Sequence, residues 1–419
     1  MKLVKMSLAA AVMLGASAFA IDNVKVSGDA KLYYGTDNQD AASAAVSDDL
    51  FDQGNSYADT ALRLSVTADL TKNVSMGATA YAISTLGLEN NLVANTWTGG
   101  HDTLVEDSAW MGELWLAGTM GKTTLKVGRM ELDTPLAFSE KWSIVPNTFD
   151  AAVVINQDIP DTTIVAAWVG KSNGADVRNT SASVADRDGI LRDGAKFGTF
   201  MENGAYVAGI VNNSFKPLVA QAWYYNIGMV ADAYWLQADI DCQLVKGVKI
   251  GAQYADIDPK KDGVLTNAAQ DSSAYAFKLA YQGIEGLNVS AAYSKTDDTG
   301  TVQIQNVAAG ANSTGQSKLY TETWWTYGYV GYKDTEAFNV TAEYDLKDVA
   351  KFGVYYTTTD NDIAGDTHTL DEVAVTATKS FGALETTLAY ISTDAGDLND
   401  NDGTADRYDS VQAYLTLKF

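Results

Sequence analysis

Apolar residues recur at every second position along much of this chain, and the alternation continues to its final residue. In the last nine residues, Val411, Ala413, Leu415, Leu417 and Phe419 fall on one face, and the intervening residues are mostly polar. A period of two places successive side chains on opposite faces of a β-strand. The pattern therefore predicts a chain of strands with one apolar face each, the last of which ends at the carboxyl terminus.

The same period appears throughout the sequence. Leu62, Leu64 and Val66 share one face of a predicted strand, while Arg63 and Asp69 take the other. Soluble sandwiches also alternate in this way, so the period alone does not decide the fold. Further alternating runs occur near 74–82, 248–254, 275–281, 287–293, 338–344, 352–356 and 384–390.

Three features favour an all-β transmembrane antiparallel barrel over a soluble sandwich. The runs are about ten residues long, which is the length that a tilted strand needs to cross the hydrocarbon of a bilayer. Aromatic residues stand at the ends of the apolar faces, as an interfacial girdle requires. These residues are Tyr81, Trp168, Tyr254, Tyr281, Tyr293, Tyr344, Tyr356 and Tyr390.

Connections between the runs alternate in length, as periplasmic turns and external loops do. Short turns are expected near 70–73, 118–121, 157–161, 241–246, 283–286, 346–350 and 380–382. Long loops rich in Asp, Asn, Ser and Gly are expected near 36–56, 84–106, 171–203, 257–271, 296–320, 360–367 and 393–406.

The alternation of loop lengths also corrects the strand count. A first count gives about nineteen strands, but bacterial single-chain barrels have an even number. The order of long and short connections changes between Tyr293 and Asp360, which identifies the aromatic stretch Thr323 to Tyr332 as a false strand. We assign that stretch to a long external loop. About 18 strands remain, a porin-sized barrel wide enough for an aqueous channel, closed by pairing of the last strand with the Lys25 to Tyr34 strand.

The amino terminus has the pattern of a secretory signal peptide. Lys2 and Lys5 precede an apolar run from Leu8 to Leu14, and an Ala-Phe-Ala sequence ends at Ala20. The apolar run is much shorter than the roughly 20 residues of a spanning helix. We expect residues 1–20 to be a signal peptide and 21–419 to form one barrel domain.

Charge and cysteine content exclude several classes of protein. The formal net charge is −24, and removing Lys2 and Lys5 with the signal peptide makes it −26. Such a chain repels nucleic acid, which needs a basic patch. Cys242 is the only cysteine, so no internal disulfide can form.

The sequence contains no pattern of an enzyme. Its two histidines, His101 and His368, fall in predicted loops or strand ends. Ser294 and Ser392 belong to no motif that joins them to either histidine, as a hydrolase would require. Phosphate-binding glycine loops and zinc-ligand spacings are also absent. We therefore predict a protein that is not an enzyme.

One acidic loop approaches the pattern of a calcium site. Asp397, Asn399 and Asp402 supply hard oxygen ligands, but the glycine falls one residue late for an EF-hand and no glutamate follows at the right distance. The residues favour a solvated acidic loop, with a calcium ion as the alternative. No cofactor is expected.

The segment between two predicted strands near Arg129 and Thr148 differs from the other loops. It holds many apolar residues, which must pack on something. Folding inward against the barrel wall would bury them and would narrow the lumen. Packing over the rim or on a neighbouring subunit is the alternative. The apolar residues are Leu132, Leu136, Phe138, Trp142, Ile144 and Val145, and the charged candidates for lining the constriction are Glu131, Asp133, Glu140 and Lys141.

Alternation also assigns charged residues to the lumen, because a charge on the lipid face would cost roughly 2–4 kcal/mol near the midplane. Arg129 has the parity of the outward residues Leu125 and Val127, so it lies at an interface or a bulge turns it inward. The lumen candidates are Arg63, Asp69, Glu113, Lys126, Lys249, Lys278, Glu343, Glu372, Glu385 and Lys418.

The run GRMELDTPLAFSEKWSIVPNTFDAAVV, from Gly128, resembles the third-loop region of the major outer-membrane porins of epsilon-type proteobacteria, including the Campylobacter-type protein. These porins are similar to OprD-type channels, whose region reads GR-x-x-L-x-TP followed by PNTF or PQTF. The resemblance extends over essentially the whole chain. It implies an 18-stranded barrel, a homotrimer, lipopolysaccharide as neighbour, an inward third loop over about Met130 to Asn147, and Phe419 as the signal for the barrel-assembly machinery. The arginine ladder of OprD-type channels for basic amino acids has no obvious counterpart here.

These observations lead to three functional hypotheses. The first is an outer-membrane porin for passive diffusion of ions and small hydrophilic solutes, weakly cation-preferring because the constriction loop has three acids against Lys141. The second is a substrate-selective OprD-type channel. The third is a structural or adhesive barrel whose aromatic 296–335 loop binds other surfaces.

Overall fold

A computed structural model gives the fold of the 419-residue chain. It describes residues 22–38, 49–88, 92–94, 107–172, 198–199, 203–261, 263, 265, 268–307, 315–363, 366–395 and 407–419. The predicted signal peptide lies outside the described residues. No helix in the described part of the chain is long and apolar enough to cross a membrane.

Nineteen strands and two single-turn 3-10 helices, Gln53–Asn55 and Tyr329–Gly331, make up the regular structure of the described residues. The first nine strands are β1 (Asp22–Asp37), β2 (Ser56–Thr71), β3 (Val74–Ser84), β4 (Ser108–Met120), β5 (Thr123–Met130), β6 (Phe149–Asn156), β7 (Thr162–Ser172), β8 (Gly198–Thr199) and β9 (Ala205–Asn212). The next ten are β10 (Leu218–Ile227), β11 (Ala231–Asp241), β12 (Val248–Pro259), β13 (Ser272–Tyr281), β14 (Leu287–Thr296), β15 (Thr335–Leu346), β16 (Ala350–Ile363), β17 (Asp366–Phe381), β18 (Leu384–Asp394) and β19 (Arg407–Lys418).

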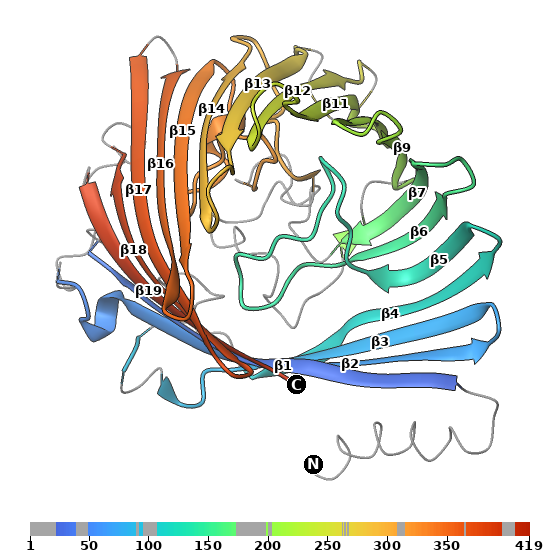
Figure 1. Cartoon of the computed structure of the whole chain (residues 1–419), viewed down its shortest axis with the longest axis horizontal. Coiled ribbons are helices and arrows are strands. Elements are labelled where there is room, and N and C mark those ends of the chain that lie inside the picture. The colour runs from blue at the N-terminus through green and yellow to red at the C-terminus, as the bar shows by residue number, and fades with distance from the viewer. Residues whose placement is uncertain are drawn as a thin grey trace.

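The strands form one closed antiparallel barrel (Figure 1). β1 pairs with β2 on one side and with β19 on the other, so that Leu32 lies opposite both Thr60 and Leu415. The two-residue β8 pairs only with the end of β7, which also pairs directly with β9. The barrel therefore has 18 long strands, and the predicted strand count and the predicted closure by the last strand are confirmed.

Side chains on the outer wall are apolar, because this wall faces the hydrocarbon of the membrane. On β13, Phe277 and Leu279 are more than half exposed, while their neighbours Ala274 and Ala276 point inward and are buried. The core of the molecule lies inside the barrel instead. One buried cluster, which includes Met130, Leu136, Phe149, Tyr225 and Trp235, lies between the wall and segments that enter the lumen. Residues 131–148, between β5 and β6, lie inside the barrel in Figure 1.

Two sequence-based expectations about the wall are wrong. Residues 360–367 were expected to form a long loop, but β16 and β17 continue as a paired hairpin as far as Ile363 and Asp366. Tyr81 was expected in the outer girdle, yet it faces the lumen and is only 1% exposed. A β-bulge explains its surroundings: the extra residue Gly112 interrupts the register between β3 and β4, and the Tyr81 ring packs against it.

Candidate pore constriction

Two segments enter the barrel and meet inside it. The first, here called the constriction loop, is residues 131–148 between β5 and β6. The second inward loop is residues 297–334 between β14 and β15, of which 297–307 and 315–334 are described. The backbone N–H of Val307 donates to the carbonyl oxygen of Leu136 at 2.8 Å, which joins the two loops. The inward fold expected for the constriction loop is confirmed.

Local hydrogen bonds shape the tip of the constriction loop. Thr134 and Ala137 bond each other in both directions, with the Thr134 N–H 3.0 Å from the Ala137 oxygen and the Ala137 N–H 3.2 Å from Thr134 Oγ1. Pro135 stands inside this turn, where its fixed φ is compatible with the fold. The next residue, Leu136, donates its N–H to the hydroxyl of Tyr225 on β10 at 3.2 Å. The loop thus extends from β5 to β10, four strands further along the wall.

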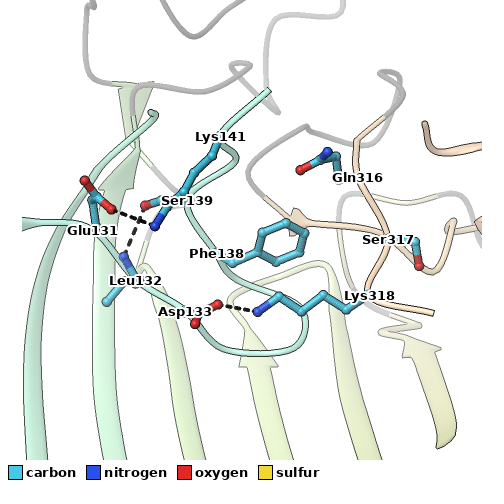
Figure 2. Close-up of a pocket in the computed structure, with 9 residues that line it drawn as sticks. All are labelled: Glu131, Leu132, Asp133, Phe138, Ser139, Lys141, Gln316, Ser317 and Lys318. Atoms are coloured by element: carbon cyan, nitrogen blue, oxygen red, sulfur yellow. Dashed lines mark hydrogen bonds and ion pairs between the residues drawn. The ribbon is translucent and has the colours of Figure 1, made fainter. Parts of the chain in front are cut away.

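A cavity of about 420 Å³ lies between the two loops. Figure 2 shows that its charged side chains come from both loops and are paired with one another. Lys318 of the second inward loop bonds Asp133 of the constriction loop, and its ammonium also lies 4.7 Å from the centre of the Phe138 ring. The cavity is lined by Glu131, Leu132, Asp133, Phe138, Ser139, Lys141, Gln316, Ser317 and Lys318.

Glu131 connects the constriction loop to the charged wall of β1 and β2. Arg63 bonds Asp29 of the wall at 2.6 Å and lies 3.6 Å from Glu131, which is itself 3.5 Å from Lys141. The structure thus brings together Arg63, Glu131 and Lys141 from the predicted set. Cations and acids alternate in this cluster, so neither sign dominates this side of the lumen.

Glu140 occupies a different position from the other charged residues of the loop. It is 5% exposed and does not line the cavity. Its carboxylate accepts hydrogen bonds from Asn306 Nδ2 at 2.7 Å and from Trp142 Nε1 at 2.7 Å. Burial raises the pKa of the Glu140 carboxyl above its usual value, although these donors oppose the shift. Glu140 therefore joins the two loops and does not present its charge to the pore.

The second inward loop was missed by the sequence analysis. Residues 323–332 form no strand, which confirms that part of the prediction. The predicted external position of this stretch is wrong, because the stretch packs inside the barrel. The Trp324 ring lies 6.2 Å from Tyr355 of the wall, and the Trp142 ring of the constriction loop lies 5.4 Å from Tyr327. A signal was present, because apolar residues in a loop must pack on something. The packing requirement that predicts an inward turn for residues 132–145 holds equally for the aromatic residues of 323–332.

Most of the remaining lumen candidates have partners on neighbouring strands. Glu343 is 2.6 Å from Lys351, and Lys249 is 3.4 Å from Asp241. Lys278 lies 4.0 Å from the centre of the Tyr320 ring in the second inward loop. The other contacts are Asp69 with Asn23, Glu113 with Thr79, Lys126 with the Trp115 ring, Glu385 with Lys418, and Glu372 with the backbone of Trp324, Trp325 and Thr326.

Arg129, whose direction the sequence left open, stays on the outer face. It lies opposite the exposed Leu114 in the register, while the next pair, Met130 and Phe149, is buried inside. Its guanidinium bonds Asp150 on β6 and donates to the carbonyl oxygen of Met111 at 3.0 Å. The bulge at Gly112 therefore does not turn Arg129 inward.

The described residues contain no cluster of three or more potential metal ligands. The calcium candidates Asp397, Asn399 and Asp402, together with His101, lie outside the described residues. Ser294 shares a hydrogen bond with Thr321 at 2.5 Å, and His368 lies on β17 opposite Asn361.

A closed 18-stranded barrel with a charged, loop-narrowed lumen and an apolar outer wall defines a porin of the outer membrane. The chain belongs to the Campylobacter major outer membrane protein family, whose model matches residues 1–415. The bacterial outer membrane is its location, and the family and fold are those of a channel rather than an enzyme.

Solved structures of Pseudomonas aeruginosa porins have the same fold. OccK8 (OprE) is 16% identical with a TM-score of 0.70, covering 96% of this chain and 99% of that chain. OpdK is 15% identical with a TM-score of 0.69, covering 94% and 99%. OccK3 (OpdO) is 13% identical with a TM-score of 0.68, covering 95% and 96%. No curated protein matches the chain.

Proposed function

We propose that this porin is a general-diffusion channel for ions and small hydrophilic solutes with a weak preference for cations. The observation that carries the proposal is the pairing of charges at the constriction. Glu131 lies near Arg63 and Lys141, and Asp133 bonds Lys318. A constriction with balanced charge discriminates weakly between small ions of either sign.

We attribute the preference for cations to the acidic connections around the mouth of the barrel, at the end opposite the short turns, rather than to the constriction. The connections 38–55, 85–107 and 395–406 contain twelve acidic residues and no lysine or arginine. The strand ends that these connections join lie at the end of the barrel opposite the short turns. An acidic mouth concentrates cations locally, and salt screens this field over about 8 Å at physiological ionic strength.

The reversal potential across a KCl gradient in a planar bilayer tests this proposal. We expect a cation preference that is clear at low salt and nearly vanishes at high salt. A preference for anions at low salt would overturn the charge argument. A purified barrel that never conducts would favour the structural or adhesive alternative.

A substrate-selective channel is the second candidate. A crystal structure of OpdK, 13% identical to this chain with a TM-score of 0.68, contains vanillate. Vanillate is therefore a suitable probe for competition with the ion current. A saturable block by vanillate, absent with a neutral solute of the same size, would favour selectivity over general diffusion.

We also propose that the porin is a homotrimer, assembled by the barrel-assembly machinery in contact with lipopolysaccharide. Support comes from a gap in the aromatic girdle. Among the described strands, β7 and every long strand from β9 to β18 except β14 have a well-exposed outer aromatic residue, whereas β1 to β6 have none. A wall that contacts protein rather than lipid does not need the girdle.

The proposed channel requires no cofactor, and a calcium ion at 397–402 is a hypothesis that calcium titration of the purified protein would test.

A further inference from the structure

Asn306 of the second inward loop holds one residue of the constriction loop by both of its backbone groups. The Oδ1 atom accepts the N–H of Phe138 at 3.2 Å, and Nδ2 donates to the Phe138 carbonyl oxygen at 2.8 Å. Nδ2 also donates to Glu140 Oε1 at 2.7 Å. Asn306 is fully buried. Phe138 is bridged to Asp133 within the constriction loop, and the Asn306 amide bonds its backbone N–H and carbonyl group, as buried backbone groups require.

Neighbouring contacts extend this junction along both loops. The N–H of Gln316 donates to Glu140 Oε1 at 3.3 Å, and the N–H of Val307 donates to the Leu136 oxygen. Asp133 and Lys318 pair at the cavity. The constriction loop contains no strand or helix, so contacts with other parts of the molecule determine where its tip lies in the lumen.

The second inward loop is itself anchored to the wall by Glu372 of β17. The Glu372 carboxylate accepts three consecutive backbone N–H groups, those of Trp324, Trp325 and Thr326, at 2.8, 2.9 and 2.6 Å. Glu372 is 2% exposed. Hydrogen bonds to an ionised acceptor are stronger than neutral ones, and successive N–H groups form a concave site for an anion. This anchor therefore resists displacement of the loop.

A second anchor lies on a different part of the wall. The Tyr320 hydroxyl donates to Asp239 on β11 at 2.7 Å, and the Tyr320 N–H donates to Gln253 Oε1 on β12 at 3.0 Å. Gln253 also donates to the carbonyl oxygen of Lys318 at 2.9 Å. The second inward loop is thus attached at β11–β12 and at β17, with Asn306 reaching the constriction loop.

We propose that the second inward loop is a strut that sets the width of the pore, with Asn306 as the positioning residue for the constriction loop and Glu372 as its anchor on the wall. This inference deepens the proposed function, since a pore must exist for its width to be set. Substituting either residue frees the constriction loop to move toward the wall, which widens the pore.

Single-channel conductance and exclusion of polyethylene glycols of graded size test the proposal. N306A is expected to raise conductance about twofold and to admit larger polymers, because the constriction dominates pore resistance. N156A is the matched control: Asn156 bonds Thr123 and Asp158 at the short-turn end, away from both loops. E372Q keeps one acceptor oxygen but removes the negative charge and places an NH2 donor where the other oxygen accepts a backbone N–H. Its control is E336Q, since Glu336 pairs with Lys295 at an exposed position. Heat-modifiable migration of each variant establishes that its barrel is folded.

N306D separates positioning from a general loss of packing. The substitution keeps the shape of the side chain but removes both donated bonds and places a carboxylate beside Glu140. We expect its pore to be wide at pH 8 and to narrow toward that of the unsubstituted protein at pH 5, where a protonated aspartic acid can again donate a hydrogen bond.

Each outcome has a distinct meaning. Unchanged conductance and polymer exclusion in folded N306A and E372Q would overturn the strut, as would a pore width in N306D that does not respond to pH. An absence of channels in the unsubstituted protein would instead overturn the proposed function.

Discussion

Arg129 and Asp150 face each other across the β5–β6 pair and form an ion pair on the outer wall of the barrel, with Arg129 Nε 2.8 Å from Asp150 Oδ1. Both side chains are only about one third exposed or less. A pair of opposite charges on this wall neutralises itself, whereas either charge alone would face an apolar environment.

Removing one partner of this pair should therefore destabilise the barrel more than removing both. We expect R129M to lower the free energy of unfolding by about 2 kcal/mol, because Asp150 then remains on the outer wall as an unpaired charge. The double variant R129M/D150L should recover most of the loss. Urea titration of the protein in lipid vesicles measures both, and a double variant as unstable as R129M would contradict the expectation.

Gly128 permits the close approach of β5 to β4. Its φ is +128°, and a Cβ atom there would lie 2.2 Å from the carbonyl oxygen of Leu114. G128A should therefore lower stability by about 1–3 kcal/mol and reduce the yield of folded barrel. G118A is the matched control, since a Cβ at Gly118 on β4 meets nothing within 4 Å. Equal yields of the two variants, measured by heat-modifiable migration, would refute the steric argument.

The Lys318–Asp133 pair balances charge across the constriction. K318Q leaves Asp133 uncompensated in the cavity and should increase the preference for cations, which a shift of the reversal potential in a KCl gradient would reveal. K216Q provides the control, because Lys216 pairs with Asp161 in a turn at the barrel's other end, at 2.6 Å. A reversal potential that does not differ between K318Q and K216Q would remove Lys318 from the selectivity of the pore.

Glu322 should make stability depend on pH. Its burial raises the pKa of the carboxyl to about 7 from 4.5, although backbone N–H groups such as that of Ser317 lower it. Between pH 4.5 and about 7 the folded state therefore holds more protons at this site than the unfolded state. This contribution to the free energy of unfolding falls as the pH rises through that window. E322Q should flatten the dependence, and urea midpoints compared at pH 5 and pH 8 would show whether it does.

Sequence periodicity was sufficient for the wall of the barrel but not for the contacts inside it. Loop parity excluded 323–332 as a strand, because each long strand reverses the side on which the chain emerges. It could not say whether that loop turns inward. Glu140 looked like a lining residue because its partner Asn306 lies 166 positions away in the sequence. Arg129 falls on the same face as the outward residues Leu125 and Val127 in the alternating sequence. Only the register of β4 with β5 near Gly112 shows that no bulge turns its side chain inward.

Pairing between the two ends of the chain has a consequence for the order of folding. The N–H and the carbonyl oxygen of Phe419 bond those of Gly28 at 3.0 and 2.8 Å. This contact joins residues separated by almost the entire sequence, so it is among the costliest to form early. Until the final strand has been exported, β1 has an unpaired edge that could join another chain. A nascent barrel of this kind must therefore be shielded for the whole of its export, and it ceases to be vulnerable to aggregation only when its last residue arrives.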